Sequence, residues 1–318
     1  MKRHRLVLLL TLSFSLFNLD AQIFEKDSVV QVVAYWSLGE SHTYKYEKNI
    51  YTIQGEDTLA WKKNKFDYIV TVTDSTDGSY TLKCQYKNVE RTSSNPLDNR
   101  MDSWVNDSLM NTVIIKTDEN GTFQSLENLE EVEKDAIKIA EIMTDSMWNM
   151  LPDSTKNVMS YEKLRETMAL ISDKKTLLPG VTEEISMLLF YHGGRYDMTD
   201  TYSMEEEYPN YFGKDPLPGK KEFWVDDYDT EDGVIEMQSY GFIDADNAIR
   251  SYFSALKNMV TEEIPPIPSE EIPVITGEDN MSVWINVDYG WTLYLIMERL
   301  FVVGNRKNVV DISLELVE

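Results

Sequence analysis

The sequence predicts an α+β protein in which a curved antiparallel β-sheet packs against several amphipathic helices. Three observations lead to this prediction. The first third of the chain alternates apolar and polar residues, the middle carries apolar residues at helical spacing, and the last third returns to alternation. Strands and helices occupy separate stretches instead of alternating regularly, so a doubly wound parallel sheet is not expected.

The strand predictions depend on period-two patterns bounded by turns that contain glycine or acidic residues. The clearest case is a hairpin whose arms, 66–73 and 80–87, alternate strictly around the turn Asp74–Gly78. A second hairpin is expected across Asp229–Gly233. The full set of expected strands is 43–53, 66–73, 80–87, 112–116, 221–228, 234–240, 283–287, 291–296 and 309–316, with 301–303 as an extension.

Apolar residues recur at helical spacing from Val132 to Met150, which predicts the first helix. Ser125 is its expected N-cap, because serine side chains accept hydrogen bonds from free backbone amides. Pro152 should end this helix, since proline lacks an amide hydrogen.

Further helices are expected at 161–171 and from Val181 onward, separated by Pro179-Gly180. A fourth helix, 244–260, has a broad apolar stripe that should pack onto a sheet. The proline-rich connector 263–273 cannot be a regular helix or a central strand. The strands that follow it are too few for a separate core, so residues 22–318 are expected to form a single domain.

The N-terminus has the layout of a secretory signal peptide over residues 1–21. Basic residues from Lys2 to Arg5 precede an uncharged, mostly apolar run from Leu6 to Phe17. That run is too short to span a bilayer, which needs about 17–25 residues. Cleavage is expected between Ala21 and Gln22, and the mature chain should be periplasmic or secreted, with no transmembrane segment.

One cysteine, Cys84, is present in the 318 residues. The chain therefore has no internal disulfide, and no cysteine at the cleavage point that could make it a lipoprotein. Because Cys84 falls on the apolar side of its strand, we expect a buried and unreactive thiol. The formal charge of −25 excludes nucleic acid as a partner, since such binding requires clustered lysine and arginine.

Residues that could perform catalysis are scarce. After cleavage only His42 and His192 remain as histidines, which disfavours a zinc site, and no nucleotide-binding or nucleophile motif is present. His192 should lie at a helix end, where the helix dipole favours its charged form. The acidic stretch 226–233 lacks two required residues of a calcium loop and is interpreted as a solvated turn. We therefore expect no catalytic, cofactor-binding or metal-binding residues and no cofactor.

The segment 198–220 is the candidate contact loop. It carries aromatic residues among glutamates, glycines and prolines, and long loops of this kind often bind partners. The alternative is that the rings tuck the loop onto the sheet. Its candidate contact residues are Tyr202, Tyr208, Tyr211 and Phe212. Glu205–Glu207, in the same segment, could contribute one carboxylate to a hydrolytic pair.

Several turn and strand motifs resemble those of a loosely defined group of exported Bacteroidota proteins of unknown function. The resemblance covers about the first 130 mature residues and implies export, but it carries no catalytic residue. The motifs are Asp20-Ala21-Gln22, the turns at Gly55 and Asp77-Gly78, and Val113-Ile114-Ile115 leading to Asp118-Glu119-Asn120-Gly121.

Three functions remain open at this stage. The first is a non-catalytic exported protein that binds an apolar ligand or a protein partner in the concavity of its sheet, as its aromatic-rich strands suggest. The second is a structural component of the envelope. The third is a carboxylate-dependent hydrolase of envelope glycans, which requires two acids facing each other in a cleft and one raised pKa.

Overall fold

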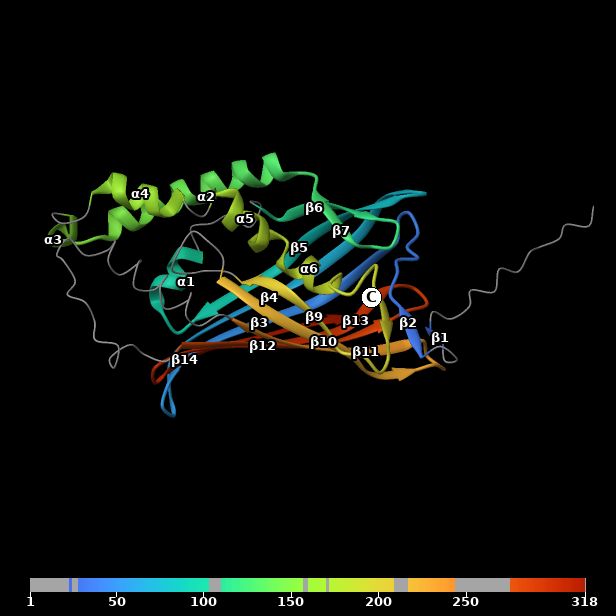
Figure 1. The fold of residues 1–318 in the computed structure, drawn as a ribbon. Helices are drawn as coiled ribbons and strands as arrows, with labels where there is room; N and C mark the ends of the chain where they lie inside the picture. The colour runs from blue at the N-terminus through green and yellow to red at the C-terminus, as the bar shows by residue number, and fades with distance from the viewer. Residues whose placement is uncertain are drawn as a thin grey trace, which may run out of the picture.

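The computed structural model describes residues 23–24, 28–102, 110–156, 160–169, 172–208, 217–243 and 275–317. Of these residues, 56% lie in strands and 23% in helices. The protein is therefore mostly β, and the predicted α+β class is wrong. Figure 1 shows a long, curved sheet with the helices gathered on one side of it.

The elements of the described residues are as follows. The strands are β1 (Ile23–Phe24), β2 (Val29–Gln31), β3 (Ser41–Gln54), β4 (Asp57–Thr76), β5 (Ser79–Ser93), β6 (Thr112–Asp118), β7 (Phe123–Leu126), β8 (Arg195–Asp197), β9 (Tyr202–Tyr208), β10 (Leu217–Asp229), β11 (Val234–Ile243), β12 (Ile275–Asn286), β13 (Trp291–Val303) and β14 (Arg306–Leu316). The helices are α1 (Pro96–Asp102), α2 (Leu129–Met150), α3 (Asp153–Lys156), α4 (Tyr161–Ala169), α5 (Lys174–Val181) and α6 (Glu183–Leu188).

The main sheet has eleven antiparallel strands in the order β7-β6-β5-β4-β3-β14-β13-β12-β11-β10-β9. Neighbouring strands are consecutive in the chain except at the centre, where the last strand β14 pairs with β3, with Leu314 opposite Tyr46. This pairing joins strands from the two ends of the chain into one sheet. A separate three-stranded sheet, β1-β2-β8, lies at one end.

The predicted hairpins are confirmed, but the strands are much longer than the patterns indicated. β4 has 20 residues, whereas the alternation predicted only 66–73. Its first half is rich in lysine and polar residues, which obscure the apolar alternation. These residues still pair, because the ladder is formed by backbone groups whatever the side chain. This extra length, together with helices that are short apart from α2, explains the error in fold class.

The helix boundaries also differ from the predictions. Ser125 is a strand residue of β7 and does not cap α2. The residue before α2 is Asn128, whose Oδ1 accepts a hydrogen bond from the Ile114 amide at 2.8 Å instead of capping the helix. Pro179 does not separate two helices but lies inside α5, near its end at Val181. Helix α4 ends at Ala169.

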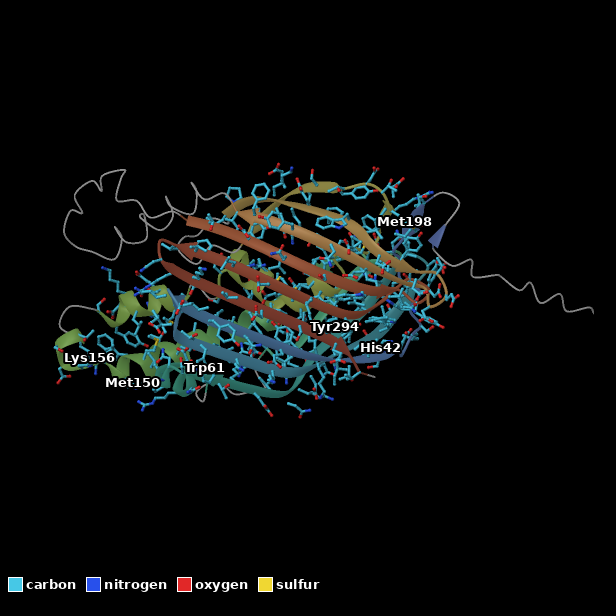
Figure 2. The ribbon with its side chains drawn as sticks, turned by 90° about the horizontal axis from the view of Figure 1, so that it is seen from below. His42, Trp61, Met150, Lys156, Met198 and Tyr294 are labelled. Carbon is cyan, nitrogen blue, oxygen red and sulfur yellow. The ribbon has the colours of Figure 1, made fainter. Side chains whose placement is uncertain are left out.

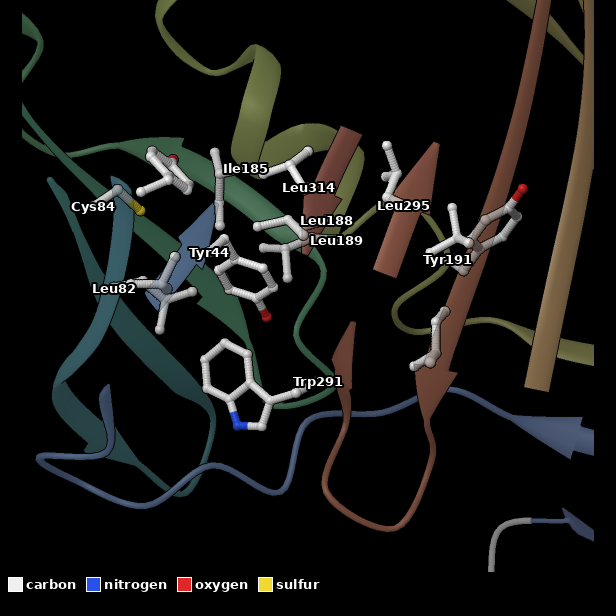
Figure 3. Packing of buried hydrophobic residues seen from close by; sticks show 14 of the residues in the cluster. Tyr44, Leu82, Cys84, Ile185, Leu188, Leu189, Tyr191, Trp291, Leu295 and Leu314 are labelled. Carbon is white, nitrogen blue, oxygen red and sulfur yellow. The ribbon is translucent and has the colours of Figure 1, made fainter. Parts of the chain in front are cut away.

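The core lies between the helices and the face of the sheet that they cover, which we call the covered face. Tyr44, Leu82 and Leu314 of the sheet pack there with Ile185 and Leu188 of α6 (Figure 3). All five are at most 3% exposed. Cys84 belongs to the same cluster as a free, buried thiol, as predicted.

The predicted signal peptide 1–21, the predicted helix 244–260 and the proline-rich connector 263–273 lie outside the described residues. The strands predicted after the connector are present as β12, β13 and β14. They occupy the middle of the main sheet, beside β3.

Candidate functional site

Two of the four candidate contact residues lie in the described part of the chain, in strand β9 instead of a loop. Tyr208 is only 1% exposed, and Tyr202 stacks on Phe223 with ring centroids 5.6 Å apart. Both rings lie on the covered face. Tyr211 and Phe212 lie outside the described residues.

The three consecutive glutamates of β9 are divided between the two faces of the sheet. Glu206 points to the covered face, where its Oε2 lies 3.0 Å from the Nζ of the buried Lys221. Glu205 and Glu207 are exposed. A second ion pair on the covered face joins Arg299 to the fully buried Asp279 at 2.7 Å. The triplet therefore does not act as one cluster.

The two histidines contact the same tryptophan cluster at one end of the sheet. Trp36 stacks on Trp291 at 4.6 Å, His42 packs on Trp291, and His192 packs on Trp36. His192 is neutral there: its Nε2 donates a hydrogen bond to the Gly290 carbonyl at 2.8 Å, and burial lowers its pKa to about 4. The expected stabilisation of a charged His192 by a helix dipole is therefore wrong, because desolvation dominates.

The acidic stretch 226–233 comprises the end of β10, as far as Asp229, and the turn that leads to β11. Asp229 Oδ1 accepts hydrogen bonds from the amides of Glu231 at 2.8 Å and Asp232 at 3.2 Å, so its carboxylate closes the turn. Among the described residues, no three His, Cys, Asp or Glu side chains gather as metal ligands.

The opposite face of the main sheet, which we call the outer face, is not covered by any described helix (Figure 2). It contains a depression of about 320 Å³ over β3, β14, β13 and β12. Two parallel rows of side chains line it, each crossing the four strands. The first row is Asn49, Asp311, Glu298 and Asn280, and the second is Glu47, Ser313, Ile296 and Ser282.

The depression forms because the two rows consist mainly of small or slender side chains between bulkier neighbours. On one side, the rings of Trp284 and Tyr294 pack with centroids 5.4 Å apart. On the other side, Tyr51 of β3 and Leu300 of β13 follow the first row along their strands. Neighbouring strands lie about 4.8 Å apart, so each row extends over roughly 14 Å. The result is a groove that runs across the strands.

The charges in this groove are unbalanced. Glu298 and Asp311 are direct cross-strand partners, and within the described part of the chain neither carboxylate has a cation partner. Burial raises the pKa of the Asp311 carboxyl, and no neighbouring charge contributes to that shift. By contrast, Lys65 neutralises Glu47 at 2.7 Å and, by its hydrogen bond, lowers the pKa of that glutamate.

A groove with two carboxylates that lack a cation among the residues described, bordered by aromatic rings, suits a positively charged group. Carboxylates form strong, charge-assisted hydrogen bonds with ammonium and guanidinium groups. Aromatic faces attract the same cations, and Trp284 and Tyr294 border the groove. In the strand predicted at 309–316, Asp311 alternates with the apolar Val310 and Ile312, a pattern typical of a residue on the polar side of a strand. The pattern could not identify Glu298 as its partner, because that depends on the register of β13 against β14.

The hydrolase and apolar-ligand hypotheses gain less from the geometry. For the hydrolase, the shift in the pKa of Asp311 comes from burial, and no neighbouring charge contributes to it. A catalytic pair is expected to show mutual coupling. For an apolar ligand, the side chains of the core occupy the covered face (Figure 3). No helix in the described residues is both long and apolar enough to cross a membrane.

Comparison with known proteins adds little. No family model and no curated protein matches the chain. Among solved structures, the chain is similar to one described as "Lipid-protein interactions in lipovitellin", with 12% sequence identity and a TM-score of 0.42. The match covers 89% of this chain and 25% of that one, so the chain spans a quarter of its length. A likeness this distant carries no argument about function.

Proposed function

We propose that this chain is an exported, non-catalytic binding protein whose outer-face groove holds a lysine or arginine side chain of a protein partner. The observation that carries this proposal is the direct opposition of Glu298 and Asp311 without a cation among the described residues. A bound ammonium or guanidinium would give both carboxylates a charge-assisted partner that the described residues do not supply.

The rest of the groove supports the same ligand chemistry. Asn280 lies directly opposite Glu298 and offers an amide oxygen to a further N–H donor. Tyr294, on the far side of the second row, is 37% exposed, which leaves its ring available to another part of the partner. The chain carries a formal charge of −25, so a basic partner would also be attracted over a longer range.

Binding of short basic peptides tests this function. We expect a hexapeptide of alternating Arg and Gly to bind the full mature chain in isothermal titration calorimetry, and binding to weaken as salt is raised. An acidic peptide of the same length should not bind. The double variant Glu298→Gln/Asp311→Asn should reduce affinity at least tenfold.

The matched control is Glu56→Gln/Asp77→Asn, which removes the same charge from two exposed hairpin turns. It should bind like the unmodified protein after correction for net charge. Equal losses of peptide affinity in the two double variants would mean that overall charge, and not the groove, attracts the peptide. No binding of the basic peptide at low salt would contradict the proposal outright.

Export is part of the same proposal. It rests on the basic, apolar and small-residue segments of residues 1–21. Intact-mass measurement of protein from the cell envelope and the culture medium should give a chain that begins at Gln22. A full-length mass in the cytoplasmic fraction alone would contradict export without affecting the groove.

A further inference from the structure

Glu184 is a buried carboxyl group in the helix that packs on the covered face. It lies in α6, is 7% exposed, and its Oε2 accepts a hydrogen bond from the Tyr86 hydroxyl at 2.9 Å. The next residue, Ile185, is fully buried in the core, and Leu188 is 3% exposed. The same six-residue helix therefore carries both a titratable group and two of the core's apolar contacts.

The surroundings of Glu184 favour the uncharged acid. Burial, reinforced by the neighbouring charge of Glu183, raises its pKa to about 7. The nearest cation, Lys48, is engaged by Glu183 at 2.7 Å. The titratable groups that face Glu184 are Tyr46 and Lys48 of β3, Tyr68 of β4, Cys84 and Tyr86 of β5, and Glu183 of α6 itself.

We propose that α6 is a pH-sensitive cover of the covered face, closed when Glu184 is protonated and opened more often when it is ionised. Few contacts outside the core hold this helix. Thr292 Oγ1 donates to the Leu188 carbonyl at 2.8 Å, and Lys48 pairs with Glu183. Opening would bring the carboxylate to water and expose apolar side chains such as Tyr44 and Leu82 that α6 now helps to bury.

The difference between the pKa of Glu184 in the closed state and in the open state gives the size and direction of the pH effect on opening. In the open state Glu184 should titrate near its ordinary value of 4.5, and in the closed state near 7. Between these values the closed state holds a proton that the open state has lost. Opening therefore becomes about tenfold more favourable per pH unit, or roughly 300-fold in all. Above pH 7 no further change is expected from this group.

Native-state hydrogen exchange of the mature chain tests this inference. The reporters are the amides of Ser186 and Leu189, which donate to Thr182 and Ile185. Their protection factors, corrected for the intrinsic effect of pH, should fall steeply between pH 5 and 7. In Glu184→Gln they should not vary with pH. His192 lies at the end of the same segment but has a pKa of about 4, so it remains neutral over this range.

A second variant separates the titration from a general loss of packing. In Tyr86→Phe, Glu184 loses a hydrogen bond that stabilises its charged form in the closed state, so the fall in protection should begin at the same pH but continue to a higher pH. The dye ANS should bind more strongly to the unmodified chain at pH 8 than at pH 5. Protection that is independent of pH, or an equal slope in Glu184→Gln, would overturn the inference. Neither result would affect peptide binding in the outer-face groove.

Discussion

Tyr208 lies across Gly241, a residue two strands away in the sheet. Its ring crosses Gly219 on β10, and its hydroxyl oxygen occupies the space that a Cβ at residue 241 would fill. A strand interior is an unfavourable place for glycine, unless another group must approach the backbone closely. These two glycines therefore allow an aromatic ring from the edge strand to lie flat on the covered face.

Gly241→Ala should lower the free energy of unfolding by about 1–3 kcal/mol, because the added methyl group overlaps the Tyr208 hydroxyl. Chemical denaturation would measure this change. Gly78→Ala is the control, since nothing lies within 4 Å of its Cβ position. Adding Tyr208→Phe should recover part of the loss, because it removes the overlapping oxygen. Equal effects of the two alanine variants would show that the contact is unimportant.

Cys84 should be unreactive in the folded protein. Its side chain is fully buried, and burial raises the pKa of its thiol to about 12, so almost no thiolate forms at neutral pH. Labelling with a thiol reagent at pH 8 should be slow without denaturant and complete in minutes with it. Fast labelling of the native chain would mean that β5 opens readily.

Glu184→Gln should stabilise the protein at pH 8 by roughly 3 kcal/mol and have little effect at pH 4.5. The folded-state pKa of Glu184, about 7, lies above its ordinary value of 4.5. Stability from this group is thus complete below pH 4.5 and is lost as pH rises to 7. Thermal denaturation of both proteins across this range measures the difference. A loss of stability on Glu184→Gln at pH 8 would indicate that the charged Glu184 carboxylate has a stabilising partner.

The titration of His192 should change stability with pH in the direction opposite to that of Glu184. Its folded-state pKa of about 4 lies below the ordinary 6.5, so its contribution is complete above pH 6.5 and is lost as pH falls to 4. Between pH 4.5 and 6.5 its effect opposes that of Glu184. Titration of the His192 ring by NMR should show no protonation above pH 5. A midpoint near 6.5 would contradict its burial as a neutral ring.

Asp311→Asn should raise the free energy of unfolding at pH 7 by less than about 1 kcal/mol, because burial disfavours the charged carboxyl and raises its pKa. The gain should vanish at acidic pH, where the carboxyl is protonated in the folded and unfolded states. Denaturation at neutral and acidic pH, with Glu56→Gln as the exposed control, measures it. A loss of stability on this substitution would mean that Asp311 already has a stabilising partner.

Local patterns were sufficient to predict the hairpins. The arms that meet at Asp74–Gly78 were correct because alternation and turn chemistry act within a few residues. The length of β4 was missed, because its lysine-rich half faces water and carries no apolar signal. The N-cap of α2 was missed because the Asn128 side chain is used by β6, a partner that local sequence does not reveal.

The candidate site, too, could be predicted only in part. Composition alone showed an acidic chain with few histidines and one cysteine, and alternation alone placed Cys84 inside and Asp311 outside. The sequence by itself determined where the hairpin turns lie and which side of a predicted strand each residue takes. Only the tertiary structure decided that β14 pairs with β3, which extends the Glu298–Asp311 pair of the β13–β14 hairpin into a groove across four strands. Turns and side-chain alternation act within a few residues, whereas pairing between strands from the two ends of the chain depends on packing across the whole sheet.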